Sequence, residues 1–297
     1  MKLVSIITVN FNQPEVTEAL LQSIFDYEDY PNYEVIVVDN GSRKDYTKEW
    51  RNRYENVTFI RSESNLGFAG GNNLGLDYAS GEYFFLINND TEITTGLTRK
   101  LVATLEKYPD VAIVSPKLHY ASQEHLIQYV GYTKMNFFTG RNRCIGQFEI
   151  DKGQYDQASA TTGFAHGAAM MVRREAVEKV GRMNEGYFLY FEELDWCERM
   201  RRAGYQIYVN TLALIYHKES VSVGKNSPLK EYYMTRNRIL FVRKYAQPFQ
   251  FAVFVMYYLL IVSPRNILRY LIRSDFNLLK AFFKGVFWHF SHTKNSI

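Results

Sequence analysis

The sequence predicts an α/β fold whose central, mainly parallel sheet is flanked by helices, and three observations indicate it. Short β-branched runs alternate with helix-like segments through the first half of the chain. Polar residues follow several of these runs, as expected at one edge of a parallel sheet. The 297 residues, of which 46% are hydrophobic, suffice for one large domain with an appendage but leave little room for two full domains.

The first half of the chain alternates strands and helices in order. The predicted strands are residues 4–9, 34–39, 57–60, 83–87 and 111–115. The predicted helices between them are residues 14–26, 45–54, 69–79 and 95–108. The first apolar run turns polar at Asn10, so it indicates a buried strand and not a signal peptide.

The second half is less regular. Residues 120–161 lose clear periodicity and predict a long loop region with short strands that shapes a cleft. Order returns in five segments: an ordered run at 163–173, helices at 174–180, 192–203 and 228–245, and a strand at 205–216. We therefore expect a folded body at residues 1–245, with halves at 1–116 and 117–245, and a helical tail at 246–297.

Polar loops follow three of the predicted strands. They are Asn10-Phe11-Asn12, Asp39-Asn40-Gly41-Ser42 and Asn88-Asn89-Asp90. Ligands bind at the carboxyl ends of such strands, although Asn, Asp and Gly also form ordinary turns. Asp90 offers the oxygen ligand that a hard divalent cation needs; its alternative role is a helix cap.

The ordered motifs of the chain resemble the family 2 glycosyltransferases of the GT-A fold, over about residues 3–245. The matching segments are VSIITVNFN, VVDNGS, NLGFAGGNN, LINND, FLYFEELDWCERMRRAGY and the IYH at 215–217. The resemblance is closest to rhamnosyltransferase-like members. It implies an inverting hexosyltransferase that moves a sugar, with rhamnose the candidate, from a nucleotide-diphosphate donor to a hydroxyl of a saccharide or lipid-linked saccharide.

The resemblance also implies the donor and metal residues. Asp39 contacts the nucleoside, near the backbone around Thr8 and Asn10. Asn88, Asn89 and Asp90 stand where the family has an Asp-x-Asp motif, so Asp90 is the remaining acidic ligand. His217 resembles the family's later metal-binding His. Imidazole favours Mn²⁺ over Mg²⁺, and one of these two ions is the expected cofactor.

The segment from Asn65 to Asn73 matches a glycine-containing loop of the family, and Asn65, Gly67 and Asn73 are predicted to bind the donor. Its glycines would let the backbone approach a phosphate closely. The spacing fits neither G-x-G-x-x-G nor the P-loop, which disfavours a nicotinamide dehydrogenase or a nucleoside triphosphatase.

An acidic cluster at Glu192, Glu193 and Asp195 opens a predicted helix. Helix capping explains such acids, but the neighbouring aromatic residues would desolvate a carboxylate and suit it to general-base catalysis. The resemblance places the base at Glu193, where the family usually has Asp, and Asp195 is the reserve candidate. Trp196 is predicted to contact the acceptor.

His166 and Gly167, in a stretch of small residues before a buried run, are also predicted to lie against the acceptor. The small side chains would let an acceptor approach the backbone. A purely structural role for His166 is the alternative.

The C-terminal part is strongly basic and apolar. From Lys225 onward, twelve Lys and Arg face two acids, a net charge of +10. Residues 249–262 form an apolar run too short to cross a bilayer, and Arg265, Arg269 and Arg273 follow it at helical spacing. These features predict a cytoplasmic protein, peripheral on the inner face of the cell membrane; packing onto the body or onto a second copy is the alternative, and a true span ranks third.

Two further partner and compartment predictions complete the set. The abundance of Phe, Leu and Ile in the basic region favours lipid over nucleic acid. The two cysteines, Cys144 and Cys197, have neither a C-x-x-C nor a zinc spacing, which fits a reducing compartment.

Two other functions fit the same architecture. A nucleotidyltransferase that makes a nucleotide sugar would need a basic glycine-rich loop near the N-terminus, and residues 10–14 contain neither Lys nor Arg. A non-catalytic membrane-bound scaffold gains some support from the two Asn residues that precede Asp90. The expected setting of the transferase, by resemblance, is bacterial cell-surface polysaccharide assembly.

Overall fold

A ten-stranded mixed sheet forms the centre of the protein, whose computed structural model describes residues 1–218 and 227–293. The sheet order is β3-β2-β1-β4-β9-β6-β10-β5, with β7 beside β6 and β8 beside β10. The strands are β1 (Val4–Asn10), β2 (Tyr33–Asn40), β3 (Val57–Ser62), β4 (Tyr83–Ile87), β5 (Thr91–Ile93), β6 (Val111–Tyr120), β7 (Ile127–Tyr129), β8 (Ala160–Thr161), β9 (Ala169–Arg173) and β10 (Gln206–His217).

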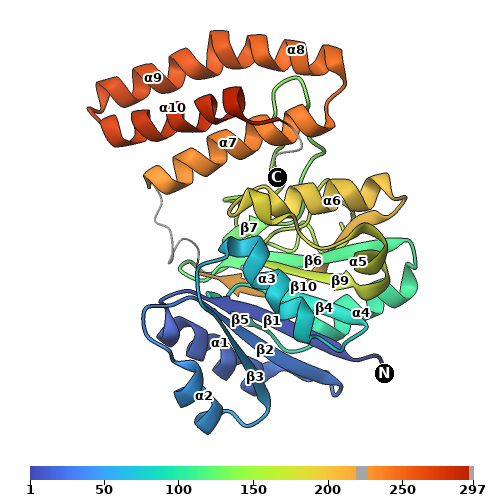
Figure 1. Cartoon of the computed structure of the whole chain (residues 1–297). Helices are drawn as coiled ribbons and strands as arrows, with labels where there is room; N and C mark the ends of the chain where they lie inside the picture. The colour runs from blue at the N-terminus through green and yellow to red at the C-terminus, as the bar shows by residue number, and fades with distance from the viewer. Residues whose placement is uncertain (219–226, 294–297) are drawn as a thin grey trace.

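Helices cover both faces of this sheet (Figure 1). One apolar core lies under α1 (Pro14–Tyr27), α2 (Thr47–Arg53) and α4 (Leu97–Lys107). The other lies under α3 (Gly67–Tyr78), α5 (Arg174–Val180) and α6 (Glu192–Arg202). Successive apolar side chains of a strand point to opposite faces of the sheet and so contribute to both cores. The α/β prediction is confirmed.

Two features of the sheet differ from the sequence prediction. Strand β9 pairs antiparallel with both β4 and β6, so the sheet is mixed at its centre. Strand β6 continues to Tyr120, beyond the predicted end at residue 115. Lys117 and His119 interrupt its apolar pattern, but both are buried because Asp151 pairs with them at 2.6 and 2.9 Å.

The C-terminal helices form a layer on the body that contains the sheet (Figure 1). They are α7 (Pro228–Tyr245), α8 (Pro248–Tyr257), α9 (Ser263–Ile272) and α10 (Phe276–Ser291), and a π-helical turn at Tyr258–Val262 joins α8 to α9. Apolar side chains of all four helices share one core cluster, and α10 runs back along α7. The layer is therefore built onto α7, the last helix of the predicted body.

The apolar run in the tail belongs to a longer helix than its composition indicated. Within the described residues, Pro248–Ile272 is the one helix that is long and apolar enough to cross a membrane, by length and composition alone. Counting only the uninterrupted apolar residues underestimated the helix, because the π-helical turn lets it continue past Ser263. One such helix is weak evidence for a span.

Candidate functional site

The carboxyl ends of β1 and β2 form a buried polar network. The Asn10 side-chain amide donates to Asp39 Oδ1 at 2.9 Å and to Ser42 Oγ at 3.1 Å. Arg61, at the end of β3, forms an ion pair with the other Asp39 oxygen and donates to the Ser42 carbonyl at 2.8 Å. Thr8 lies two residues before Asn10 on β1 and points to the same face of the sheet. Its Oγ1 is buried without a hydrogen-bond partner among the described residues. The predicted donor residues Thr8, Asn10 and Asp39 thus lie together.

The next loop is held by amide side chains. Asn40 Nδ2 donates to Asn65 Oδ1 at 3.2 Å and to the Gly67 carbonyl at 3.0 Å. Asn65 Oδ1 also accepts from Gly67 N at 2.8 Å. Asn65 and Gly67 therefore lie beside the Asp39 network, where they shape the turn into α3.

The glycines of α3 serve packing against the sheet. A Cβ at Gly71 would lie 2.8 Å from Val9 Cγ1, so the helix approaches β1 only because these side chains are absent. Asn73 binds the backbone of Met183 through both its amide atoms and donates to Glu185 Oε1 at 2.9 Å. These contacts occupy both Nδ2 protons and link α3 to residues 183–185.

Asp90 and His217 lie side by side, because β5 and β10 pair antiparallel with His217 opposite Thr91. His217 Nε2 is 3.1 Å from Asp90 Oδ1, yet it is buried and makes no hydrogen bond within the described part of the chain. His217 Nδ1 is 2.8 Å from Gln128 Oε1, which fixes the ring with Nδ1 as the donor. Nε2 therefore presents its lone pair beside the carboxylate, and this donor set fits a divalent cation.

The other members of the LINND segment contribute less to this pair. The Asn89 side-chain amide donates to Thr17 Oγ1 at 3.1 Å, which ties this residue to α1. Asn88 is partly exposed beside Asp90, and its backbone N–H donates to Ala168 O at 2.9 Å. Among residues 1–218 and 227–293, no cluster of three or more His, Cys, Asp or Glu could hold a metal. A cation here would complete its shell with donor phosphates and water.

His166 joins this pair to the predicted acceptor side. Its ring centroid is 6.0 Å from that of His217, and its ring stacks on Tyr132. Burial, reinforced by His217, lowers the pKa of His166 to about 3, so the ring is neutral near pH 7. Nδ1 accepts from Ala168 N at 3.1 Å, which leaves the proton on Nε2.

The paired acids Glu192 and Glu193 open α6 in a buried, aromatic environment. The Oε2 atom of each is buried without a hydrogen-bond partner among the described residues. Burial raises the pKa of Glu193 to about 7, although N–H groups at the start of α6 oppose the shift. Burial and then the charge of Glu193 hold the pKa of Glu192 well above its ordinary value. Glu193 is therefore the first of the two to ionise.

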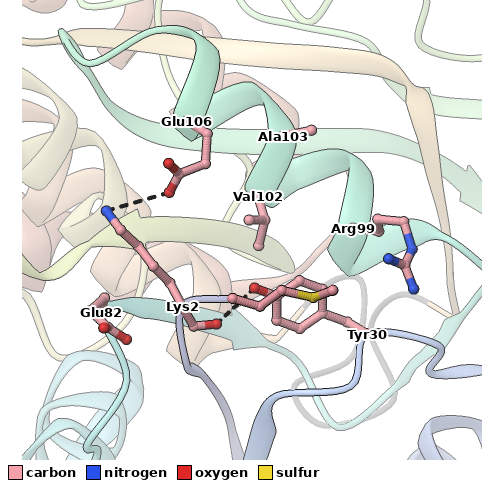
Figure 2. A pocket seen from close by; sticks show the side chains of 8 residues that line it. Lys2, Tyr30, Glu82, Arg99, Val102, Ala103 and Glu106 are labelled. Atoms are coloured by element: carbon pink, nitrogen blue, oxygen red, sulfur yellow. Dashed lines mark hydrogen bonds and ion pairs between the residues drawn. The ribbon is translucent and has the colours of Figure 1, made fainter.

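Gly167 brings Glu193 next to His166. A Cβ built on Gly167 would lie 3.7 Å from Glu193 Cγ, so the Glu193 side chain lies close to the backbone of Gly167. Glu193, Gly167, His166, His217 and Asp90 thus form a continuous group at one edge of the sheet. The hollow drawn in Figure 2 lies at the opposite edge of the sheet, next to the residues that precede β1. Lys2 and Glu106 line it and form an ion pair of 3.4 Å.

Two residues predicted for this group lie outside it. Asp195 is fully buried and accepts from Arg199 and Lys244 at 2.8 Å each and from the Tyr245 hydroxyl at 2.6 Å. Burial alone would raise the pKa of Asp195, but these hydrogen bonds and charges bring it below its ordinary value. Trp196 is fully buried and its Nε1 donates to Gly181 O at 2.8 Å. These contacts join α6 to α7 and to the core.

Sequence reasoning missed Gln128 and Arg61. Gln128 lies in the region predicted as loop, and only the pairing of β7 with β6 brings it to His217. Arg61 is the next-to-last residue of β3, whose predicted boundary stopped at residue 60. An arginine directly after a strand next to the Asp39 strand was the available signal.

Comparisons with known proteins show the family and the fold. The model of glycosyl transferase family 2 matches residues 5–181. The protein y4gI of Sinorhizobium fredii is 30% identical over 75% of this chain but only 25% of its own length. The hexosyltransferase Agl10 of low-salt glycan biosynthesis in Haloferax volcanii is 28% identical over 80% of this chain and 74% of its own. An N-acetylglucosaminyl-diphospho-decaprenol L-rhamnosyltransferase of Mycobacterium tuberculosis is 24% identical over 62% of this chain and 66% of its own.

Two solved structures share the fold. GalNAc-T7 with UDP, GalNAc and Mn²⁺ has a TM-score of 0.63 at 14% identity, over 84% of this chain and 52% of its own. The mannosyltransferase PcManGT of Pyrobaculum calidifontis, in complex with GDP-Man and Mn²⁺, has a TM-score of 0.59 at 15% identity, over 97% of this chain and 88% of its own.

Proposed function

This chain belongs to glycosyl transferase family 2 and has the GT-A fold, and from that premise we propose a metal-dependent, inverting hexosyltransferase with Glu193 as its base. The observation that carries the proposal is the convergence of Glu193, His166, His217 and Asp90 at one sheet edge. A relative named as a rhamnosyltransferase supports rhamnose as the candidate sugar.

The donor binds along the ends of β1, β2 and β4. Asp39, held by Asn10 and Arg61, receives the nucleoside, and the free Thr8 hydroxyl offers it a further partner. Asp90 and His217 would hold Mn²⁺ or Mg²⁺, which when bound neutralises the charge that develops on the departing diphosphate. Gln128 keeps His217 in the tautomer that leaves Nε2 free for this purpose.

The acceptor hydroxyl lies between Glu193 and the donor. The ionised Glu193 carboxylate takes the hydroxyl proton as the oxygen bonds to the anomeric carbon, and the bond from that carbon to the phosphate oxygen breaks. A nucleoside diphosphate leaves, and one displacement inverts the configuration. Neutral His166 offers its Nε2 proton to an oxygen of the acceptor or diphosphate, while Gly167 leaves room for the acceptor.

We further propose that the α8–α10 layer holds the enzyme on the inner face of the cell membrane. Phe249, Leu260, Ile272 and Phe290 are 71–84% exposed. Exposed basic residues on the same helices match an anionic lipid surface; they are Arg265, Arg269, Arg273, Lys280 and Lys284. Such a position suits a lipid-linked saccharide acceptor in cell-surface polysaccharide assembly, which the glycan-biosynthesis relative supports.

Thermal-shift measurements with UDP, GDP and dTDP, each with and without Mn²⁺, test the donor site. We expect one nucleotide to raise the melting temperature only when Mn²⁺ is present, and Asp90→Asn to abolish the Mn²⁺-dependent part. Asp77→Asn, which changes a surface acid paired with Arg182, is the matched control. Pyrophosphate release from a nucleoside triphosphate would favour a nucleotidyltransferase instead.

Vesicle sedimentation tests the membrane surface. We expect binding to phosphatidylcholine vesicles that contain phosphatidylglycerol and weaker binding to phosphatidylcholine alone. Replacing Arg265, Arg269 and Arg273 by Gln should reduce binding, whereas Arg51→Gln on α2 should not. A stable dimer that does not bind either vesicle would show that a second copy covers this layer.

A further inference from the structure

The segment that leads into the acidic pair has an unfavourable backbone conformation. Phe188, Tyr190 and Phe191 have φ values of 64°, 67° and 76°, in the left-handed region that side chains with a Cβ avoid. Each such residue costs about 1–2 kcal/mol, so residues 188–191 do not hold this shape on local preference. Because Glu192 and Glu193 follow directly, whatever restrains this segment also places their carboxyl groups.

Two adjacent residues of α7 supply most of that restraint. Asn237 Nδ2 lies 3.0, 2.8 and 2.7 Å from the carbonyl oxygens of Tyr187, Leu189 and Tyr190. Arg236 donates to the carbonyl oxygens of Gly186 and Tyr187 at 2.7 and 2.8 Å. Five carbonyl contacts therefore reach one short segment from a single turn of helix.

The two side chains also orient each other. Arg236 Nε donates to Asn237 Oδ1 at 2.7 Å, which turns the Asn237 amide so that its N–H groups face the segment. Arg236 is 7% exposed and Asn237 is 0% exposed, so both donor side chains are largely shielded from water. The arrangement resembles a preorganised clamp, since losing either side chain removes hydrogen-bond donors from the carbonyl groups of this segment.

The α8–α10 layer reaches the same arginine. The Arg236 guanidinium lies 5.3 Å from the ring centre of Trp288 on α10, and His289 Nε2 lies 2.9 Å from the Arg236 carbonyl oxygen. On the other side of the segment, Phe68 N donates to Phe188 O at 2.7 Å. The segment is thus held between α3 and α7, and α10 covers the arginine that holds it.

We propose that Arg236 and Asn237 are positioning residues that hold residues 186–191 so that Glu193 faces the acceptor site beside Gly167. This inference rests on the proposed function, because it gives Arg236 and Asn237 no role other than through Glu193. Neither side chain contacts Glu193 in the structure; each acts through the backbone of the segment before it.

Hydrogen exchange tests the clamp without any substrate. Arg236→Gln should increase exchange of the amides from Gly186 to Leu194 selectively. The matched control is Arg243→Gln, because Arg243 lies on the same helix and also binds carbonyl groups, those of His289 and His292. Equal exchange in wild type and Arg236→Gln, or an equal increase in Arg243→Gln, would overturn the proposal.

Kinetics separate positioning from general stability. With the nucleotide hexose that the thermal-shift panel selects, Arg236→Gln should lower kcat about 10–100-fold and leave the donor KM within about twofold. Arg236→Lys should recover part of the loss, because it retains one donor. Asn237→Asp, which replaces the donating group with an acceptor, should behave as Arg236→Gln. Asn210→Asp should not, because Asn210 lies on β10 and bonds α4 and the backbone of Leu212 instead of the segment at 186–191.

A double-mutant cycle decides whether the effect passes through the base. In a Glu193→Gln background, Arg236→Gln should cause no further loss of kcat, because the positioned group is already absent. Losses that multiply in the double variant would overturn the positioning role but leave the proposed function intact. A wild-type rate in Glu193→Gln alone would instead remove the proposed function.

Discussion

Replacing Glu193 by Gln should make the enzyme more stable at high pH while it removes most of its activity. Burial raises the pKa of Glu193 to about 7 from an ordinary 4.5. A shift of that size corresponds to about 3 kcal/mol, at 1.36 kcal/mol per unit. The folded-state pKa is raised, so this stabilisation is complete below the unfolded value and is lost as pH rises through about 7.

Gln stays neutral at every pH, so the variant does not lose this stability. Above about pH 8 it should melt roughly 5 °C higher than wild type, whereas near pH 4, below the ordinary pKa of 4.5, the two proteins should melt together. The activity should fall about 10²–10⁴-fold, the usual contribution of a general base. In wild type, kcat/KM should rise about tenfold per pH unit below 7 and then level off.

Circular-dichroism melts across this pH range, with parallel transfer assays, measure both effects. Glu198→Gln is the control on the same helix: Glu198 forms ion pairs with Arg201 and Arg202, so its neutralisation should lower the melting temperature at high pH. A Glu193→Gln variant that is less stable than wild type at high pH would refute the burial argument. Full activity in that variant would refute its role as the base.

Four further substitutions address other parts of the structure. Gly67→Ala should destabilise the protein by about 2 kcal/mol more than Gly96→Ala in urea unfolding. Both glycines have positive φ, 73° and 75°, so the backbone strain is similar. Only at Gly67 would the new Cβ also overlap a backbone atom, Phe188 O. Equal destabilisation would show that this contact relaxes. His217→Gln should remove the Mn²⁺-dependent thermal shift with the selected nucleotide, and an unchanged shift would exclude His217 as a ligand. Gln128→Leu should lower the Mn²⁺ affinity about 10–100-fold, because it frees the ring of His217. Asp151→Asn should lower the free energy of unfolding by about 2 kcal/mol at neutral pH. Burial by itself would raise the pKa of Asp151, but hydrogen bonds and ion pairs with Lys117 and His119 lower it to about 2. This contribution is present above the ordinary pKa of 3.8 and disappears as pH falls through about 2, so the two proteins should differ in stability at neutral pH and become equally stable in acid.

The sequence by itself determined the elements and their chemistry. The nearly continuous burial of β1, β2 and β4 follows from their short uninterrupted apolar runs, which are typical of strands covered on both faces. The helical segments between them follow from the helical period of their apolar residues. Short motifs then placed Asp39, Asp90 and Glu193 next to strand or helix ends. The boundaries at β6 escaped this reasoning, since Lys117 and His119 are buried only through partners that lie in a distant loop.

Only the tertiary structure decided which of these groups meet. Asp90 and His217 become neighbours through the antiparallel pairing of β5 and β10, and Gln128 reaches His217 through β7. Likewise, Asp195 forms ion pairs with Arg199 of its own helix and with Lys244 of α7. Glu193, two residues earlier, has no cationic partner at hydrogen-bond distance in the described structure. Local pattern fixes how a side chain leaves its own backbone, but its partner depends on register and packing between segments that are remote in the chain.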